Sequence, residues 1–203
     1  MTPRPSIAVL ASPLLAALAA CAGSAGPAAA PVQVESLMGR NVDPIGVVVD
    51  MPDGQYLGDR ATSPTAATPT VYRWDALTQA FDRFSQDYKL STEDLRAAGL
   101  PVLDGDELEF TEGRFRDTRY RLGGELHRLT IGGQADFEVR IGVRWRLFDT
   151  QTSSYVLEKE TTGYARGGVL GDRGTRPNTL LSAFESALGA LVTDPAFPSL
   201  GGE

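Results

Sequence analysis

The chain has 203 residues, 42% hydrophobic and 22% charged, which is the composition of a globular protein long enough for one domain with a substantial core. Its formal net charge of −7 argues against nucleic acid as a partner, because domains that bind a duplex are usually basic. The single cysteine excludes an internal disulfide, and the single histidine excludes any site that needs two imidazoles.

Residues 1–20 have the pattern of an export signal peptide. Arg4 gives a positively charged start, and the apolar run at 7–20 has the length of a signal-peptide core but is short for a membrane span. The run ends in Leu-Ala-Ala-Cys at 18–21, which places the only cysteine directly after small residues. An ordinary secretory signal with a chance cysteine, or a buried core thiol, is the alternative interpretation.

The Leu-Ala-Ala-Cys sequence resembles the bacterial lipoprotein signal, the lipobox. This resemblance implies cleavage before Cys21, transfer of a diacylglycerol to its thiol, and acylation of the new amino group with a chain such as palmitate. Three acyl chains anchor a protein firmly, since each buried methylene contributes about 0.8 kcal/mol. Ala22 follows the cysteine, whereas an aspartate there retains lipoproteins in the inner membrane of enteric-type bacteria. The resemblance therefore implies lipid anchoring at the periplasmic face of the outer membrane.

The sequence after the signal divides into a tether and one domain. Residues 21–31 comprise the lipidated cysteine and the low-complexity sequence AGSAGPAAAP, which predicts a flexible tether. We found no internal repeat in residues 32–203 and no second domain boundary, so we expect a single α+β periplasmic domain there.

The first part of the domain predicts a strand and a long connection. Residues 45–51 form a short apolar, β-branched run that is typical of a buried strand. Residues 52–69 contain three prolines and no apolar periodicity, which predicts a long connection without regular structure. Such a connection is either a partner-binding loop or a tolerated surface insertion.

Two helices are predicted next. Residues 74–88 predict a helix, because Leu77, Phe81, Phe84 and Tyr88 form one apolar stripe that we expect to face the core. A second, short helix is expected after it.

The short helix has clear start and stop signals. Ser91 or Thr92 caps it, Asp94 occupies a position near that of a capping box, and Gly99 ends it. A short strand is conceivable at 108–110.

Three strands in succession form the centre of the predicted fold. Residues 116–131 predict a long strand that Gly123-Gly124 interrupts by a bulge or sharp bend. Gly132-Gly133 turns the chain into residues 136–150, where strict alternation predicts a strand with an apolar buried face and a basic outer face. Residues 155–164 return as a third strand.

The sequence after the third strand predicts a glycine-rich loop and a last helix. Residues 167–174 are the loop, and Pro177 begins a helix that ends before Asp194-Pro195. The expected buried face of this helix comprises Leu180, Leu181, Phe184, Leu188, Leu191 and Val192. The predicted fold class is therefore α+β: an antiparallel sheet made of a three-strand meander plus an N-terminal strand, with helices packed on one face.

Three groups of residues carry side chains or glycines of a kind that can serve chemistry, and we expect no catalytic, cofactor or metal site in any of them. His127 is the one candidate general base, but no Gly-x-Ser-x-Gly sequence supports a hydrolase triad, and we expect His127 on the same strand face as Glu125 and Leu129. The glycines of residues 167–174 lack the Lys-Ser or Lys-Thr of a phosphate loop. An acidic turn resembles a fragment of a calcium loop without its closing glutamate; its carboxylates are those of Asp104, Asp106, Glu107 and Glu109.

The basic face of residues 136–150 is a candidate surface. If Asp149 faces Tyr155 across the turn, Arg146 meets Glu158 and Arg144 meets Glu160 on the third strand, and each ion pair contributes about 0.2–1 kcal/mol. These arginines, together with Arg140, then belong to a neutralised sheet face. The alternative is a surface for anionic lipid or for a partner protein.

Residues 143–163 resemble a segment of bacterial envelope lipoproteins related to the curli secretion lipoprotein and to the amino-terminal domain of the translocation protein TolB. In those proteins a strand ends in an Asp-Thr-x-Thr turn, matched here at 149–152, and the return strand carries a valine and then Thr-Gly, matched by Val156 and Thr162-Gly163. The resemblance implies an assembly or accessory role without catalysis.

Three functions follow as hypotheses. The first is a non-enzymatic outer-membrane lipoprotein that serves as an accessory or assembly subunit of a cell-envelope, secretion or surface-appendage complex, with the membrane and an envelope protein complex as partners. The second is an auxiliary lipoprotein of lipid or lipopolysaccharide transport, which needs an apolar groove between sheet and helices. The third is a hydrolase that uses His127.

Overall fold

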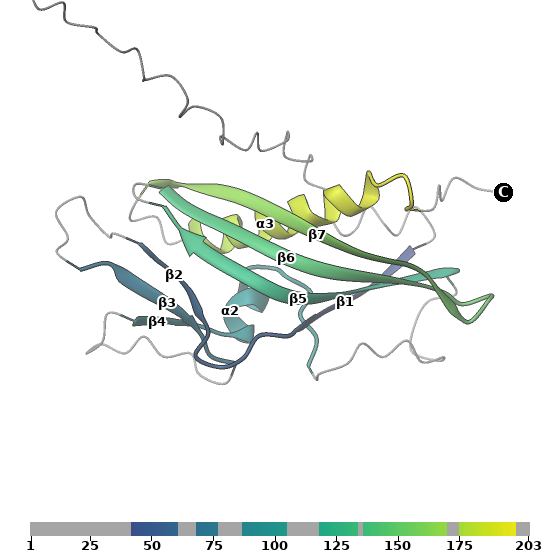
Figure 1. Cartoon of the computed structure of the whole chain (residues 1–203), viewed down its shortest axis with the longest axis horizontal. Coiled ribbons are helices and arrows are strands. Elements are labelled where there is room, and N and C mark those ends of the chain that lie inside the picture. The colour runs from purple at the N-terminus through teal and green to yellow at the C-terminus, as the bar shows by residue number, and fades with distance from the viewer. Residues whose placement is uncertain are drawn as a thin grey trace, which may run out of the picture.

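A computed structural model describes residues 42–60, 68–76, 87–104, 118–133, 136–169 and 175–197. Within these residues the chain forms two sheets and two helices, so the predicted α+β class is confirmed (Figure 1). The strands and helices are β1 (Val42–Val49), β2 (Tyr56–Arg60), β3 (Thr70–Trp74), β4 (Asp87–Leu90), α2 (Thr92–Ala97), β5 (Tyr120–Gly132), β6 (Asp136–Asp149), β7 (Ser154–Val169) and α3 (Thr175–Val192).

The larger sheet has the strand order β1-β5-β6-β7. Strands β5, β6 and β7 form the predicted antiparallel meander, and the N-terminal strand β1 joins β5 in parallel. Helix α3 packs on one face of β6 and β7 (Figure 1). The sheet therefore has an inner face that carries the core and an outer face on the opposite side.

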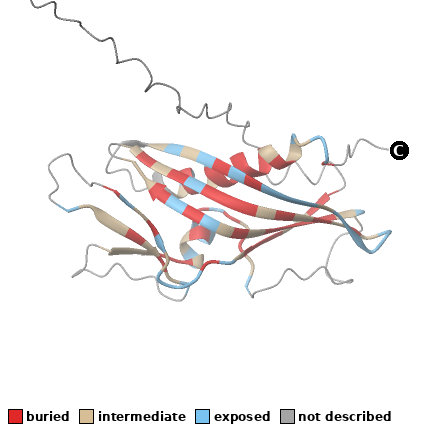
Figure 2. Cartoon of the chain, viewed as in Figure 1, coloured by how far each residue is buried: buried red, intermediate tan, exposed pale blue. Residues whose placement is uncertain are grey.

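Strand β6 alternates as its sequence predicts. Buried and less buried residues alternate along much of β6 (Figure 2). Arg140 is exposed, and Arg144 and Arg146 are half-buried. The buried set is Phe137, Val139, Ile141, Val143, Trp145 and Leu147. Because these side chains lie between two neighbouring strands and below α3, β6 forms the centre of the core.

Helix α3 approaches β7 closely at Gly163. A Cβ atom on Gly163 would lie 1.8 Å from the carbonyl oxygen of Ala183 and 2.7 Å from the amide nitrogen of Ala187, so only glycine allows this contact. Beside it, the Trp145 indole N–H donates to the Thr161 hydroxyl over 2.7 Å, and that hydroxyl donates to the carbonyl of Ala187 over 2.8 Å. The Thr-Thr-Gly sequence of β7 is therefore a helix-docking site.

The smaller sheet, of order β2-β3-β4, corrects two predictions. Residues 52–69 are not one irregular connection, because residues 56–60 form β2 and pair with β3. The helix expected at 74–88 is wrong at both ends, since Trp74 ends β3 and Tyr88 lies in β4, which pairs parallel to β3. The alternation of residues 70–74 buries Tyr72 and Trp74 to 1% exposure each, which is why Trp74 belongs to a strand. The stripe residues Leu77, Phe81 and Phe84 lie outside the described residues.

The two sheets share one core. Gly58 of β2 has a φ of +135°, and a Cβ atom there would lie 1.9 Å from the carbonyl oxygen of Ile131 in β5. Only glycine combines that backbone conformation with so close an approach. The Tyr72 and Phe137 rings meet edge to face, with centroids 6.1 Å apart.

The bulge expected at Gly123-Gly124 lies elsewhere. Strand β5 passes through both glycines in unbroken register with β6, and the register shifts between Leu126 and Arg128 instead. Gly124 makes room for β6, because a Cβ atom there would lie 3.0 Å from a Val143 methyl group and 3.1 Å from the Trp145 ring. Glycine at 124 therefore serves packing, and the bulge falls at His127.

The remaining boundaries differ in smaller ways. Strand β5 begins at Tyr120, and β7 continues through Gly167 and Gly168 to Val169, so the loop predicted from 167 starts later. Helix α3 begins at Thr175, before Pro177. The predicted strand at 108–110 lies outside the described residues.

The capping prediction for α2 is confirmed. Ser91 is its N-cap, Asp94 completes a capping box, and Gly99 follows the helix with a φ of +92°.

Candidate functional site

The predicted lipidation site and its flanking segments lie outside the described residues. Cys21, the signal peptide and the tether therefore remain sequence predictions. In the part of the chain that the structure describes, neither helix is long and apolar enough to cross a membrane.

The acidic turn is only partly described. Asp104 forms an ion pair with Arg96 at 2.5 Å, and the other three carboxylates of the turn lie outside the described residues. Among the residues that the structure describes, no three His, Cys, Asp or Glu side chains form a group that could hold a metal ion.

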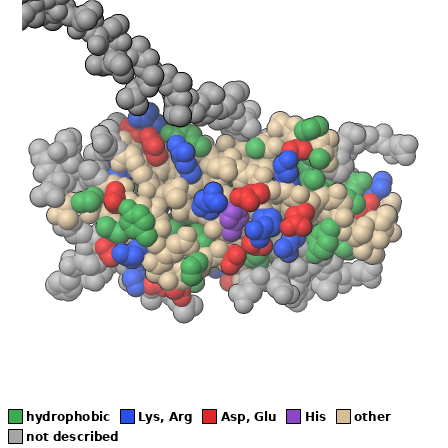
Figure 3. Space-filling view, viewed as in Figure 1, with side chains coloured by type: hydrophobic (Ala, Val, Ile, Leu, Met, Phe, Trp, Pro, Cys, Tyr) green, Lys and Arg blue, Asp and Glu red, His purple; other side chains and the backbone are tan. Residues whose placement is uncertain are grey.

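The outer face of the larger sheet gathers the charged residues that the sequence singled out. Figure 3 shows it with the histidine in purple among blue basic and red acidic side chains. We define the outer sheet face as the side chains that alternate with the core residues; they are Glu125, His127, Arg128 and Thr130 of β5, Glu138, Arg140, Gly142, Arg144 and Arg146 of β6, and Glu158, Glu160, Thr162, Tyr164 and Arg166 of β7.

The arginines of β6 use a different acidic partner from the one predicted. The register places Arg146 opposite Glu158 and Arg144 opposite Glu160, as expected, although Asp149 faces Ser154 and not Tyr155. Both arginines nevertheless form their ion pairs with Glu125 of β5. One carboxylate oxygen of Glu125 lies 2.7 Å from Arg144, and the other lies 3.7 Å from Arg146.

The position of Glu125 explains this choice. Glu125 lies directly opposite Arg144 on β5, and its side chain is only 15% exposed. A half-buried carboxylate needs a charged partner more than the exposed carboxylates of β7 do, so one glutamate holds two arginines.

His127 occupies the bulge of β5, so its predicted face was partly wrong. The extra residue puts His127 and Arg128 together on the outer sheet face, whereas Leu129, expected to share a face with His127, is buried in the core with 1% exposure. Two apolar runs of opposite parity, at 122–126 and 129–131, were the signal in the sequence that could have located this bulge.

The imidazole of His127 lies between Glu160 and Gly142. Its Nε2 lies 3.2 Å from a carboxylate oxygen of Glu160, and the ring packs over Gly142, where a Cβ atom would lie 3.3 Å from it. In the described residues, Nε2 has no hydrogen-bond partner of suitable geometry, so no hydroxyl is placed to lose its proton to this nitrogen as in a hydrolase triad.

The Asp-Thr-x-Thr turn is built around a buried carboxylate. Asp149 accepts hydrogen bonds from the backbone N–H groups of Gln151 (2.8 Å) and Thr152 (3.4 Å) and from the Arg119 guanidinium (3.2 Å). Burial raises the pKa of Asp149, but these donors together lower it below its ordinary value. The turn therefore closes the β6–β7 hairpin with an ionised aspartate.

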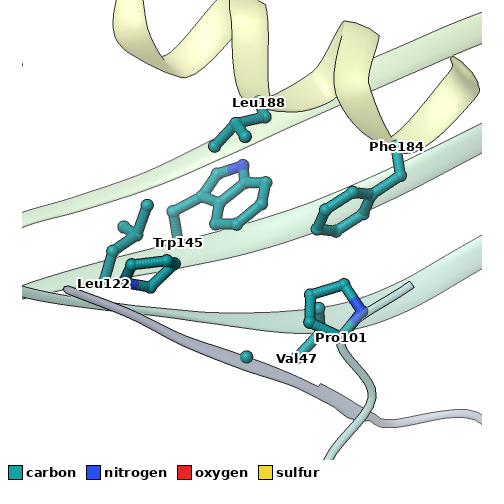
Figure 4. Close-up of a pocket in the computed structure, with 8 residues that line it drawn as sticks. Val47, Pro101, Leu122, Trp145, Phe184 and Leu188 are labelled. Carbon is teal, nitrogen blue, oxygen red and sulfur yellow. The ribbon is translucent and has the colours of Figure 1, made fainter. Parts of the chain in front are cut away.

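An apolar pocket lies between the larger sheet and α3 (Figure 4). Its cavity volume is about 10 Å³, which is room for about one water molecule. Pockets for drug-sized ligands usually measure about 300–1,000 Å³, so this one does not hold a whole ligand as it stands. Its lining residues are Pro44, Gly46, Val47, Pro101, Leu122, Trp145, Phe184 and Leu188.

The fold and this surface define an α+β domain with one helix-covered sheet face and one charged, open face. No protein-family model matches the chain, and no curated protein matches it.

Several solved structures resemble the chain weakly. Protein XCC0632 from Xanthomonas campestris, of family DUF330, is 14% identical, covers 74% of this chain and 81% of its own, and has a TM-score of 0.30. A candidate lipoprotein from Caulobacter crescentus is 16% identical, with 55% and 80% covered and a TM-score of 0.34. Lipoprotein GNA1162 from Neisseria meningitidis is 13% identical, with 72% and 97% covered and a TM-score of 0.24. Two of these three are described as lipoproteins, but TM-scores this low support no conclusion about this chain.

Proposed function

We propose that this protein is a non-enzymatic outer-membrane lipoprotein, anchored by lipid at Cys21, that serves as an accessory or assembly subunit of a cell-envelope, secretion or surface-appendage complex. The observation that carries the proposal is the order of the sequence: an apolar signal core, Leu-Ala-Ala-Cys, a low-complexity tether and then the α+β domain. A tether of the ten residues 22–31 has a root-mean-square reach of about 17 Å. The domain would then stay near the membrane yet be free to turn toward a partner.

The outer sheet face supports an interaction role. Most of its charged side chains are exposed or half-exposed, and Tyr164 is exposed beside them. A sheet face left open on a lipid-anchored domain is suited to contact with another protein. The ion pairs already described on it restrain several of its side chains.

Membrane fractionation combined with mild crosslinking tests the proposal. We expect the wild-type chain to sediment with outer membranes and to give a crosslinked species larger than the monomer. Cys21→Ser should be unprocessed or soluble and should give much less of that species. A wild-type chain found as an uncrosslinked monomer, or a Cys21→Ser chain that fractionates and crosslinks normally, would contradict the proposal.

A second candidate function is that of an auxiliary lipoprotein for lipid or lipopolysaccharide transport, and the apolar pocket of Figure 4 is the observation that favours it. Its space could hold part of an acyl chain if α3 moved outward. Phospholipid that remains bound to the purified chain without its signal and Cys21, and that is lost in Leu188→Phe, would support this candidate. A preparation free of lipid would exclude stable lipid binding.

A further inference from the structure

Within the described part of the chain, three charged side chains of the outer sheet face have no partner of opposite charge. Glu125 forms ion pairs with both Arg144 and Arg146, and Glu160 lies against His127. Arg166 lies 2.6 Å from Asp136 and 3.7 Å from Glu138. Within the described residues, no side chain of opposite charge pairs with the three that remain, which are Arg128, Arg140 and Glu158.

The bulge of β5 brings the two unpaired arginines together. Arg128 lies opposite Gly142, and Arg140 is two residues away on β6, so they are diagonal neighbours with Cα atoms about 7–8 Å apart. Gly142 has no side chain, and a Cβ atom built there would lie 3.2 Å from the Arg128 Cβ and 3.3 Å from the His127 ring, so the imidazole lies between the two arginines. We call the surface formed by Arg128, Arg140, Gly142 and Thr162 around this ring the basic notch.

The notch is partly organised before any partner arrives. The Arg140 guanidinium lies over the Tyr164 ring, 5.2 Å from its centroid, and this cation–π contact restrains the side chain. Arginine presents a planar set of donors that fits a carboxylate at two points. Neither Arg128 nor Arg140 has an anionic partner among the described residues, so an acidic group placed beside them would be favourable.

We propose that the basic notch is the docking point for an acidic segment of a partner protein. The proposal rests on the proposed function and adds to it the surface and the chemistry of the partner. The sequence directs attention to Arg140 and Arg144, whereas the structure shows Arg144 already paired with Glu125 and assigns the contact to Arg128 and Arg140.

The charge pattern favours a protein over an anionic membrane surface. Glu158 lies opposite Arg146. Arg146 is six residues along β6 from Arg140, so Glu158 lies about 20 Å from the basic notch along the strand direction. Glu158 and Glu160 are exposed on the same face and would repel a continuous layer of anionic headgroups. A folded partner can set carboxylates against the notch and a basic residue against Glu158.

Photocrosslinking in the native cells, with the full lipidated chain, tests this inference. A benzoylphenylalanine at Thr130, which is exposed and lies opposite Arg140, should crosslink to a protein, and the crosslinked peptide should be rich in Asp and Glu. The same group at Tyr56, exposed on the smaller sheet, is the control and should not give this adduct.

Charge removal provides the second arm. Arg128→Ala/Arg140→Ala should reduce recovery of the adduct's partner about tenfold, which corresponds to 1.4 kcal/mol of affinity. The control variant Arg73→Ala/Lys89→Ala also removes two positive charges, but from the smaller sheet, and it should leave recovery of the partner unchanged. The contacts of Arg128 and Arg140 with the acidic segment should also weaken as the salt concentration is raised.

The outcomes separate this inference from the proposed function. If the Cys21-dependent complex persists and the notch variant recovers it like wild type, the inference is wrong and the proposed function stands. A phospholipid adduct at residue 130 would replace the protein partner by a membrane surface and overturn the inference. If no complex forms in any arm, both fail.

Discussion

Gly163→Ala is the sharpest test of how α3 is held on the sheet. A Cβ atom at this position would lie 1.8 Å from the Ala183 oxygen, and real Cβ contacts are essentially never shorter than 3.0 Å. The backbone of α3 must therefore retreat by at least 1.2 Å, the difference between these two distances. Phe184 and Leu188 would then lose their fit against Trp145, whose ring centroid lies 5.6 Å from that of Phe184.

The magnitude follows from the cost of overpacking. Such changes typically cost about 1–3 kcal/mol, and a rigid backbone obstacle places this one at about 3 kcal/mol. With a urea slope of about 2 kcal/mol/M, the unfolding midpoint should fall by about 1.5 M. Tryptophan fluorescence of the chain starting at Ala22 reports the transition, because Trp74 and Trp145 are both buried.

Gly132→Ala is the matched control, since nothing lies within 4 Å of a Cβ atom built there. Its free energy of unfolding should stay within about 0.5 kcal/mol of the wild-type value. Equal midpoints for Gly163→Ala and Gly132→Ala would refute the close docking of α3 on β7.

Three further predictions concern the core, the turn and the connection between β2 and β3. Trp145→Ala should cost about 3–5 kcal/mol and nearly unfold the domain, whereas Arg144→Ala should cost about 1 kcal/mol or less; equal melting temperatures would mean that the faces of β6 are reversed. Asp149 has a lowered pKa in the folded chain, so its contribution is present above the unfolded pKa of about 3.9 and is lost as the pH falls through the folded value. Asp149→Asn should therefore be less stable than wild type at pH 7, and the gap should shrink in acid titrations below about pH 4; a constant gap would contradict the ionised turn. Replacing residues 61–67 with Asn-Gly should change thermal stability little but impair recovery of the envelope complex, and full recovery would remove this segment from the interface.

The strands of the meander could be predicted because the alternation of apolar and polar residues within each strand indicates which side chains are buried. Apolar residues occupy every second position from Phe137 to Leu147, and this period is compatible with only one strand face in the core. The N-cap and stop of α2 were equally local, because Ser91, Asp94 and Gly99 act within one turn of chain. Local patterns of this kind need no information from distant segments.

The parts that could not be predicted depend on pairs of distant segments. Gly58 interrupts the alternation of residues 56–60, and the need for glycine becomes clear only from its close contact with Ile131 of the other sheet. The bulge at His127 follows from matching β5 to β6, and it decides that Arg128 joins Arg140 and that Glu125 faces Arg144. The arginines of β6 were therefore predicted on the correct face, but the acidic partner of Arg144 and Arg146 was not predicted.

Mass spectrometry of the intact mature chain, extracted from membranes with detergent, tests the central claim most directly. The account predicts a chain that begins at Cys21 and carries three acyl chains, one of them on the amino group. In Cys21→Ser, that species should be absent and the signal peptide retained or cleaved elsewhere. A mature wild-type chain that begins at another residue, or that carries Cys21 as a free thiol, would contradict lipid anchoring and with it the proposed function.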